Sequence, residues 1–128
     1  MARRPTRPLG QIGEEVAARF LRRRGVTILE RNLRSRLGEI DLVGREGGTL
    51  VFVEVKARQS DRGDPPQAAV DSRKQARLGR LAAGYLAGRR LGERRCRFDV
   101  VAVTLDGEGG APRVEYFPGA FTLDGWVG

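Results

Sequence analysis

The residues with the clearest chemical potential lie in one short segment, GEIDLVGREGGTLVFVEVKAR, which spans residues 38–58. Asp41 and Glu54 are separated there by twelve residues, and Lys56 follows Glu54 at the two-residue period of a strand. Glu54 and Lys56 therefore share one strand face, with valines on the other. A carboxylate and an ammonium group are costly to bury among apolar side chains unless each has a partner. A bound cation is one such partner.

A turn within residues 45–49 would pair the two strands as a hairpin and bring Asp41 opposite the region of Glu54. Two carboxylates would then converge on one point, and the backbone carbonyl of Val55 would add a third oxygen ligand. Such ligands suit Mg²⁺ or Mn²⁺, which keep several bound waters and accept phosphate oxygens. Lys56 would lie beside a metal-bound water, where it could orient that water or stabilise charge on an attacked phosphate.

The same side chains also allow a simpler interpretation, a cross-strand salt bridge on a solvated sheet face. Apolar residues on both faces of residues 50–58 indicate a central strand instead, which favours the metal site. Lysine is also scarce, since only two of the 24 basic residues, Lys56 and Lys74, are lysines. Arginine stays protonated, whereas the pKa of a lysine changes on burial, so the position of Lys56 favours a specific role.

Two further carboxylates are candidates for the same site. Glu14 lies at the edge of the apolar stripe of a predicted helix and would point inward, although the helix dipole also favours a carboxylate near a helix N-terminus. Glu39 shares the strand face of Asp41. It could bind a second metal, or it could pair with one of two nearby arginines, Arg34 or Arg36.

Other side chains have two interpretations each. Lys74 lies on the inward face of a predicted second helix near its N-terminus, where it could bind a phosphate or snorkel at the edge of the core. Arg58 continues the face of the EVK sequence and is a candidate phosphate contact. We expect Asp99 to form a strand-edge salt bridge. Two aromatic residues, Tyr85 and Trp126, are expected to pack in the core and the tail.

The elements that position these residues follow from hydrophobic periodicity and turn residues. The predicted order is α-β-β-β-α-β with a short tail, which gives an α/β fold with a mixed central sheet flanked by helices. We expect residues 1–10 to be a flexible basic arm and residues 11–128 to be a single domain. The predicted strands span residues 26–33, 39–43, 50–58, 96–105 and 113–117, and a mobile loop is predicted at 59–72. The first predicted helix spans residues 11–24, with Ile12, Val16 and Phe20 on one line. The second spans residues 72–90 and is expected to bury Leu78, Leu81, Ala82 and Tyr85.

The composition excludes several classes of protein. The 24 Lys and Arg against 16 Asp and Glu give a formal net charge of +8, so a polyanion is the first partner expected. One cysteine and no histidine exclude a disulfide framework, a Cys/His zinc site and histidine-based catalysis. No apolar run approaches the roughly 20 residues of a membrane-spanning helix, and no signal-peptide stretch follows the arginine-rich start. We therefore expect a cytoplasmic protein without membrane contact.

The spacing D-x(12)-E-x-K after GEID resembles the PD-(D/E)xK nuclease superfamily, which has the restriction-endonuclease-like fold and includes archaeal Holliday-junction resolvases. Over residues 10–103 the chain resembles more closely the bacterial YraN family of endonuclease-like proteins. The pieces that carry this resemblance are GEEVAARFLRRRG, LERNLR, GEIDLV, LVFVEVKAR, AVDSRKQARL, AAGYL and RFDV. Ile40 stands where the superfamily has its proline, a residue that supplies no ligand.

The resemblance implies a restriction-endonuclease-like core of order αβββαβ and a nuclease that depends on Mg²⁺ or Mn²⁺. It implies that Asp41 and Glu54 are metal ligands, that Lys56 is the catalytic lysine and that Glu14 completes the site. DNA is the expected substrate, with RNA as the alternative. Because the sequence contains no base-reading module, we expect a structured or branched substrate rather than a short recognition sequence.

Two other classes of function remain open at this point. One is a nucleic-acid-binding scaffold protein of repair or recombination that keeps the nuclease fold without turnover. The other is a basic protein associated with RNA or the ribosome, which rests on charge alone. Resolution of a junction needs two cuts and would favour a homodimer, although neither heptads nor a large apolar stripe indicates an interface.

Overall fold

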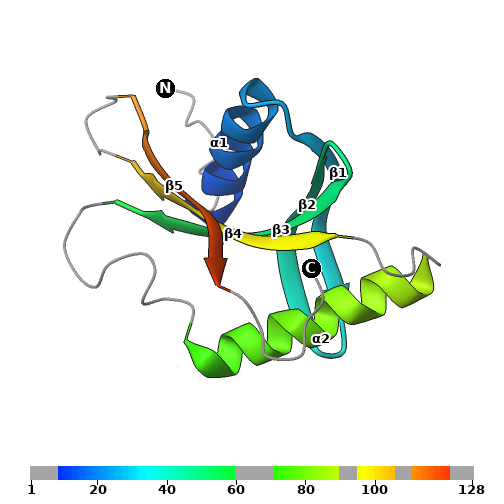
Figure 1. Ribbon diagram of the computed structural model, residues 1–128. Helices are drawn as coiled ribbons and strands as arrows, with labels where there is room; N and C mark the ends of the chain where they lie inside the picture. Colours follow the sequence, from blue (N-terminus) through cyan, green and yellow to red (C-terminus); the bar gives the residue numbers. More distant parts are fainter. Residues whose placement is uncertain (1–8, 60–70, 90–94, 106–110, 122–128) are drawn as a thin grey trace, which may run out of the picture.

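The computed structural model of the chain describes residues 9–59, 71–89, 95–105 and 111–121. Its elements follow the predicted order, and the last predicted segment is a longer strand that continues to Phe121 (Figure 1). The elements are α1 Leu9–Arg23, β1 Thr27–Ser35, β2 Gly38–Glu46, β3 Thr49–Arg58, α2 Ser72–Gly88, β4 Cys96–Thr104 and β5 Arg113–Phe121.

A five-stranded sheet forms the centre of the molecule, in the spatial order β1-β2-β3-β4-β5. Neighbouring strands are antiparallel except β3 and β4, which run parallel and are joined by the crossover that contains α2. A parallel pair requires such a crossover because the chain must return to the same end of the sheet. β3 is therefore the middle strand of a mixed sheet, as its apolar residues predict.

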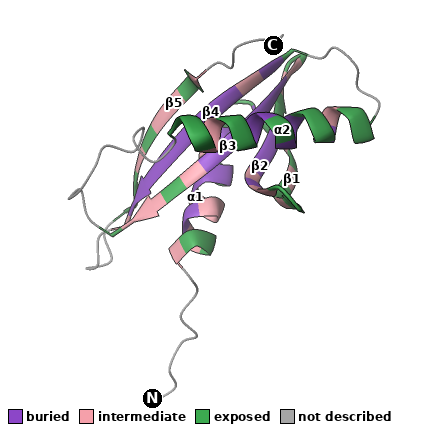
Figure 2. Ribbon diagram, turned by 90° about the horizontal axis from the view of Figure 1, so that it is seen from below, coloured by how far each residue is buried: buried purple, intermediate pink, exposed green. Residues whose placement is uncertain are grey.

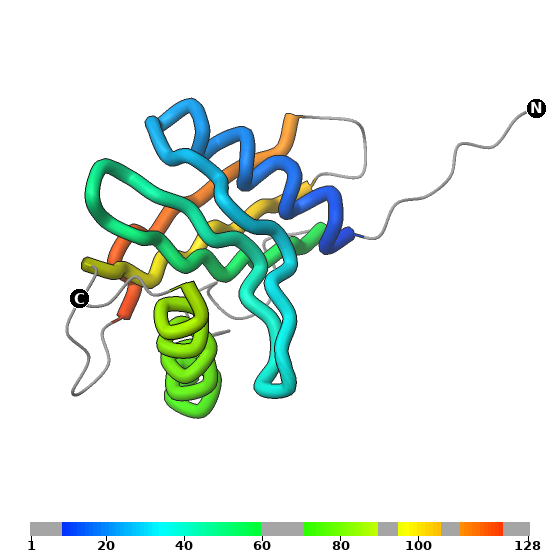
Figure 3. The backbone as a smooth tube through the Cα atoms, turned by 90° about the vertical axis from the view of Figure 1, so that its right-hand side faces the viewer, coloured from blue at the N-terminus to red at the C-terminus, as the bar shows by residue number. Residues whose placement is uncertain are grey.

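The two helices pack on opposite faces of the sheet (Figure 3). Each helix closes its own apolar cluster, and the buried strand residues lie in the inner strands β2, β3 and β4 (Figure 2). The mixed sheet flanked by helices confirms the predicted α/β class and has the arrangement of a restriction-endonuclease-like core. The α1 cluster contains Ala17, Ala18, Leu21, Leu42, Val51 and Val53, and the α2 cluster contains Ile40, Leu50, Phe52, Leu78, Leu81, Ala82, Tyr85 and Phe98.

Helix α1 lies close against β3 because small residues contribute to its contact surface. Gly13, Ala17 and Leu21 are buried, whereas Ile12 and the rest of the predicted line are half-buried. A Cβ atom on Gly13 would lie 2.6 Å from the Cβ atom of Ala57. Val16 and Phe20 of the predicted line pack against the α1 cluster, and the neighbouring line, which includes Gly13, is the more deeply buried one. Periodicity counts apolar side chains and gives no weight to a glycine that packs through its backbone.

Helix α1 begins at Leu9, two positions before its predicted start, so Leu9 and Gly10 belong to the helix rather than to the arm predicted over residues 1–10. Leu9 is half-buried and extends the apolar stripe of the helix. The rest of that predicted arm, most of the predicted loop and Trp126 lie outside the described residues. None of the helices in the described ranges is long and apolar enough to cross a membrane.

Helix α2 begins directly after Asp71, whose side chain accepts a hydrogen bond of 2.9 Å from the backbone N–H of Lys74. Its predicted buried face is confirmed, including Tyr85, which is 6% exposed. The helix ends at Gly88, before the predicted end at residue 90. Arg89 caps this end, and its guanidinium group lies 4.0 Å from the centre of the Tyr85 ring.

A buried polar network joins β4 to β5. The Asp99 carboxylate accepts hydrogen bonds from Arg97 (2.9 and 3.2 Å), from the Tyr116 hydroxyl (2.5 Å) and from the Gly119 N–H (2.8 Å). Burial and then the hydrogen bond to Asp99 raise the pKa of Tyr116 to about 12. The expected salt bridge of Asp99 is present, but its predicted place at a strand edge is wrong, because β4 is an inner strand.

Candidate metal centre

Strands β2 and β3 separate at the position where Asp41 and Glu54 would face each other. Their backbone pairing ends at Leu42 and Val53, the residues next to Asp41 and Glu54 on the side of the turn. Beyond this pair, Oδ2 of Asp41 accepts a hydrogen bond of 2.8 Å from the backbone N–H of Val55. The predicted hairpin is confirmed, and a carboxylate takes the place of the next backbone acceptor. Because a side chain replaces the backbone acceptor here, the two strands are no longer paired at this end of the hairpin, and their side chains can form a site.

Three carboxylates from two elements gather at this end of the hairpin. Glu14 of α1 and Glu39 and Asp41 of β2 each offer an oxygen, and these oxygens lie within 4.8 Å of one another. All three residues are half-buried. The two-residue period of β2 places Glu39 and Asp41 together, and the packing of α1 on the sheet brings Glu14 to them.

The environment of Asp41 disfavours its anionic form. Burial, followed by the nearby charge of Glu54, raises the pKa of Asp41 to about 8. A hydrogen bond with the Glu54 side chain and the charge of Glu14 act in the same direction, whereas the N–H of Val55 lowers the pKa. Glu54 is itself buried, with 9% of its surface exposed. Carboxylates this close ionise together at low cost only when a cation lies beside them.

Glu14 has a milder form of the same environment. Burial is the largest influence and raises the pKa of Glu14, a hydrogen bond from the Asn32 side chain lowers it, and the charge of Glu39 raises it. Asn32 lies in β1 with a φ of 52°, in the left-handed region that asparagine adopts more readily than most residues. This irregular position in the strand therefore accompanies a contact with the carboxylate cluster.

The two lysines of the chain lie in different surroundings. Nζ of Lys74, in the first turn of α2, forms an ion pair with Oε2 of Glu54. Lys56 is exposed, shares the Glu54 face through the strand period, and has no ion pair with any residue that the structure describes. Lys74 rather than Lys56 therefore neutralises Glu54 here. The catalytic role of Lys56 and the phosphate contact of Lys74 stay predictions.

Two arginines near the site are held by carboxylates. Nε of Arg58 donates to Oγ1 of Thr104 (3.2 Å), and Nη2 donates to Oε1 of Glu115 (3.4 Å). The side chain of Arg58 is 17% exposed and connects β3 to β4 and β5, so its predicted phosphate contact would need these bonds to open. Nε of Arg34 donates to Oε2 of Glu39 (2.9 Å). Glu39 thus pairs with Arg34 and also belongs to the cluster, as its two interpretations allowed.

The donor atoms of this site fit a hard divalent cation. Glu14, Glu39 and Asp41 offer carboxylate oxygens, and Glu54 interacts directly with Asp41. Mg²⁺ and Mn²⁺ prefer such oxygens and retain water on their open positions. A divalent cation would also compensate the charges that burial makes unfavourable. The backbone carbonyl of Val55 is the further ligand predicted from the sequence.

Comparison with known proteins covers the whole of this site. The profile described as "Uncharacterised protein family UPF0102" matches residues 13–103, which include every residue of the carboxylate cluster and both lysines. The chain belongs to the UPF0102 family. This assignment confirms the family that the sequence motifs indicate.

Relatives within the UPF0102 family match over nearly their full length. The UPF0102 protein of Moorella thermoacetica is 54% identical over 112 residues, which cover 88% of this chain and 93% of the relative. That of Syntrophotalea carbinolica is 49% identical over 118 residues, with 92% and 94% covered. That of Anaeromyxobacter dehalogenans is 49% identical over 121 residues, with 94% and 88% covered. The chain is thus similar to whole UPF0102 proteins rather than to one domain of larger ones.

Sequence reasoning missed two features of this UPF0102 site. Asn32 was not identified as a contact of Glu14, and its signal was an asparagine within a predicted strand, where the residue is uncommon. The ion pair of Lys74 with Glu54 was also missed. Its signal was the inward position of a scarce lysine, but the partner depends on how α2 packs against β3.

Proposed function

We propose that this UPF0102 protein is a metal-dependent endonuclease that hydrolyses phosphodiester bonds in structured or branched DNA. The observation that carries the proposal is the gathering of Glu14, Glu39 and Asp41 oxygens within 4.8 Å, at the point where β2 and β3 separate. Buried Glu54 lies beside this cluster. Carboxylates that repel one another in the absence of a cation favour a functional site over a stabilising one.

Each side chain of the candidate site would have a separate role in the proposed hydrolysis. Bound Mg²⁺ or Mn²⁺ would polarise the scissile phosphate and lower the pKa of a water ligand. Asp41 and Glu54 would hold the ion, with Glu14 and the Val55 carbonyl completing its surroundings. The N–H of Val55 orients the Asp41 carboxylate in advance, so little rearrangement is needed. Lys56, exposed on the Glu54 face, would stabilise negative charge on the attacked phosphate.

Lys74 would act as the cation that Glu54 exchanges for the metal. Its ammonium group contacts the carboxylate that the proposal assigns to the metal. Once Glu54 coordinates the ion, Lys74 would be released to contact a substrate phosphate near the N-terminus of α2. This exchange would keep the buried carboxylate neutralised in both states.

The charge of the chain supports a nucleic acid as substrate. The formal net charge is +8, and the basic residues are almost all arginines. Such an excess binds phosphate backbones without reading bases, and the sequence contains no base-reading motif. Selection by DNA shape is therefore part of the proposal, and junctions, flaps and nicks are the forms to test.

The test is a cleavage assay with linear, nicked, flapped and four-way-junction DNA in Mg²⁺, Mn²⁺ or chelator. Wild type is compared with Asp41→Ala and Lys56→Ala, and Arg73→Gln on the exposed side of α2 serves as the control. We expect metal-dependent cuts on branched DNA that are lost in Asp41→Ala and Lys56→Ala and kept in Arg73→Gln.

The opposite results are equally informative. DNA binding without cuts in any metal, unchanged by Asp41→Ala, would contradict the nuclease and favour a scaffold in repair or recombination. Metal-dependent cuts in a structured RNA, with none in the DNA forms, would transfer the activity to RNA. The purified protein must be tested at more than one concentration, because two cuts in a junction would favour a homodimer.

A further inference from the structure

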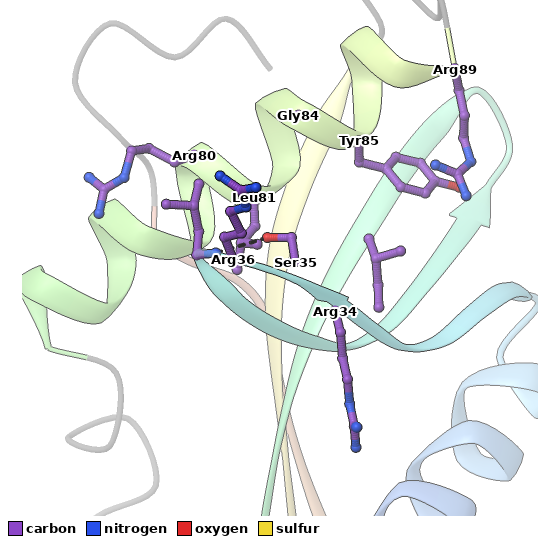
Figure 4. Close-up of a pocket in the computed structure, with 10 residues that line it drawn as sticks. Arg34, Ser35, Arg36, Arg80, Leu81, Gly84, Tyr85 and Arg89 are labelled. Carbon is purple, nitrogen blue, oxygen red and sulfur yellow. Dashed lines mark hydrogen bonds between the residues drawn. The ribbon is translucent and has the colours of Figure 1, made fainter.

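A cavity of about 440 Å³ lies between the end of the β1–β2 hairpin and helix α2 (Figure 4). The residues proposed for the metal centre are not among its lining residues. Binding cavities for small molecules begin at roughly 300 Å³, so this one accommodates a single base with its sugar. The lining residues are Leu33, Arg34, Ser35, Arg36 and Leu37 from the hairpin and Arg80, Leu81, Gly84, Tyr85 and Arg89 from α2.

The surface of this cavity is mainly apolar and includes an exposed stretch of helix backbone. Leu33, Leu81 and Tyr85 contribute its apolar side chains. Gly84 has no side chain, and a Cβ atom there would meet no atom within 4 Å. Packing therefore does not require this glycine, although glycine weakens a helix interior relative to alanine. Its absence of a side chain lets a flat ligand approach the backbone of α2 closely.

Positive charge surrounds the apolar surface. Arg36 in the turn and Arg80 on α2 have no ion pair with any residue that the structure describes, and no acidic residue lines the cavity. Arg89 covers one side of the Tyr85 ring at 4.0 Å. Arg89 and Arg34 are themselves paired, with Glu30 and Glu39, so Arg36 and Arg80 supply the positive charge beside the apolar surface. This combination fits a ligand in which an apolar ring is attached to an anion. A nucleotide has this composition.

The tip of the hairpin carries an exposed apolar side chain. Leu37 is 45% exposed, next to Arg36. The Leu37 N–H donates a hydrogen bond of 3.1 Å to Oγ of Ser35, which pairs with Gly38 across the turn. Figure 3 shows this tip extending alongside α2. Leucine side chains flanked by basic residues are among those that proteins insert between base steps of DNA.

One arginine connects the cavity to the carboxylate cluster. Arg34 is a lining residue whose side chain points away from Tyr85 in Figure 4 and donates to Glu39 of the cluster. β1 is the edge strand of the sheet, so a nucleic-acid strand can pass around it. A nucleotide in the cavity would thus lie one arginine side chain away from the proposed metal centre.

We propose that this cavity binds an unpaired nucleotide of the DNA substrate. The base would lie on the apolar surface against Gly84, and its flanking phosphates would contact Arg36 and Arg80. Leu37 would occupy the gap that the base leaves in the base stack of the duplex. The inference rests on the proposed function and extends it, because it names the substrate feature that is selected: an unpaired position beside the cleaved bond.

A peptide is the other occupant that an apolar cavity with a basic rim suggests. Extended peptides need a series of pockets at alternate residues, and helical peptides need a long groove. This cavity is one compact space, closed on one side by the hairpin and on the other by α2. Its shape and the net charge of +8 therefore favour a nucleotide over a peptide.

The test uses a DNA duplex with one unpaired 2-aminopurine and a fully paired duplex of otherwise identical sequence, both in chelator so that no cutting occurs. Transfer of the base into the cavity changes the fluorescence of 2-aminopurine. We expect wild type to bind the bulged duplex about tenfold more tightly than the paired one, the effect of one well-placed base.

Matched variants separate the cavity from general charge. Gly84→Leu fills the cavity without a change of charge, and Ala83→Leu adds the same side chain on the exposed side of α2. Arg80→Gln removes a rim cation, and Arg73→Gln removes an exposed arginine outside the cavity. We expect Gly84→Leu and Arg80→Gln to lose the preference for the bulge and the two controls to keep it.

Several outcomes would overturn the inference. Equal affinity of wild type for both duplexes, or equal behaviour of Gly84→Leu and Ala83→Leu, would remove the nucleotide site. Binding of an acidic peptide of alternating Glu and Leu that only Gly84→Leu abolishes would assign the cavity to a protein partner. Since all binding is measured without metal, metal-dependent cutting with no bulge preference refutes the cavity alone, and a bulge preference without cutting refutes the nuclease alone.

Discussion

Asp41 is subject to opposing influences within a few ångströms. Its carboxylate is buried beside Glu54, and it also accepts a hydrogen bond from the N–H of Val55. The first influence favours the neutral acid and the second favours the anion. Burial and the charge of Glu54 dominate, so a cation beside the group would favour loss of its proton. The protonation of Asp41 is therefore controlled by its immediate neighbours.

The pH dependence of stability follows from this shift. The pKa of Asp41 rises from its ordinary value of 3.8 to about 8 in the folded chain, so the folded state keeps a proton that the unfolded state releases. In chelator, the stabilising contribution of Asp41 should be complete below about pH 4 and decline as the pH rises to about 8. Urea denaturation of wild type and Asp41→Asn across this range measures it. A difference between the two that does not change with pH would contradict the shift.

The ion pair of Lys74 with Glu54 gives a second prediction. Lys74→Gln leaves the buried carboxylate of Glu54 without its cation. We expect the free energy of unfolding in chelator to fall by about 1–2 kcal/mol, less than for a fully buried pair because Lys74 is partly exposed. Mg²⁺ should restore part of the loss. Arg73→Gln is the control, and an equal loss in both variants would show that the pair contributes nothing specific.

At the scale of elements, the site depends on how closely α1 approaches β3. Glu14 reaches the cluster because the preceding Gly13 packs against Ala57. The separation of β2 and β3 positions Asp41, because it leaves the N–H of Val55 available to the Asp41 carboxylate. A helix position and a strand separation thus bring together carboxylates that are far apart in the sequence.

A substitution at this contact tests the link between packing and site. In Gly13→Ala the added Cβ atom would lie 2.6 Å from that of Ala57, so α1 must move. We expect a loss of about 1–2 kcal/mol in unfolding free energy and weaker Mn²⁺ binding, since Glu14 moves with the helix. Gly10→Ala, with open space around its Cβ, is the control and should be neutral or slightly stabilising.

The reciprocal change sharpens the Gly13 experiment. Adding Ala57→Gly to Gly13→Ala removes the opposing methyl group and should return α1 to its place. Recovery of Mn²⁺ affinity in the double variant, measured by calorimetry, is the expected outcome. If Gly13→Ala alone kept the wild-type affinity for Mn²⁺, Glu14 would not contribute to metal binding.

At the scale of the whole molecule, the excess of arginine bears on the proposed binding of a nucleic acid. The net charge of +8 would attract phosphate backbones before any specific contact forms, if the proposed nucleic-acid substrate is correct. Shape selection by the cavity and cutting at the metal centre would follow this capture. Affinity and specificity would therefore come from different parts of the fold.

The salt dependence of binding tests this division. We expect the affinity of the Asp41→Asn chain for paired DNA in chelator to fall at least about tenfold between 50 and 200 mM salt, because each phosphate contact releases counterions. The preference for a bulged duplex should persist over the same range, since it depends on an apolar cavity. Fluorescence anisotropy gives both quantities. Affinity that is insensitive to salt would exclude a binding mode dominated by phosphates.

The sequence by itself determined the elements and the composition of the site. The periodicity of two in VFVEVKAR and of 3.6 in the two helices reflects local backbone geometry, which tertiary contacts change little. Asp41, Glu54 and Glu39 could be placed together because a short hairpin fixes register over a few residues. The α/β class followed from the order of elements. These properties depend on residues that are close in the sequence, so they can be recognised from residue types and spacing alone.

The tertiary structure alone decided which partners these residues have. Gly13 is more deeply buried than Ile12, Asn32 bonds to Glu14, and Lys74 pairs with Glu54. For Gly13 the contact that packing decided is the one with Ala57. Each contact joins elements whose relative position is set by packing of the whole core, and no local period encodes it. The buried place of Asp99 arose in the same way, because the order of strands in the sheet is a property of the complete fold.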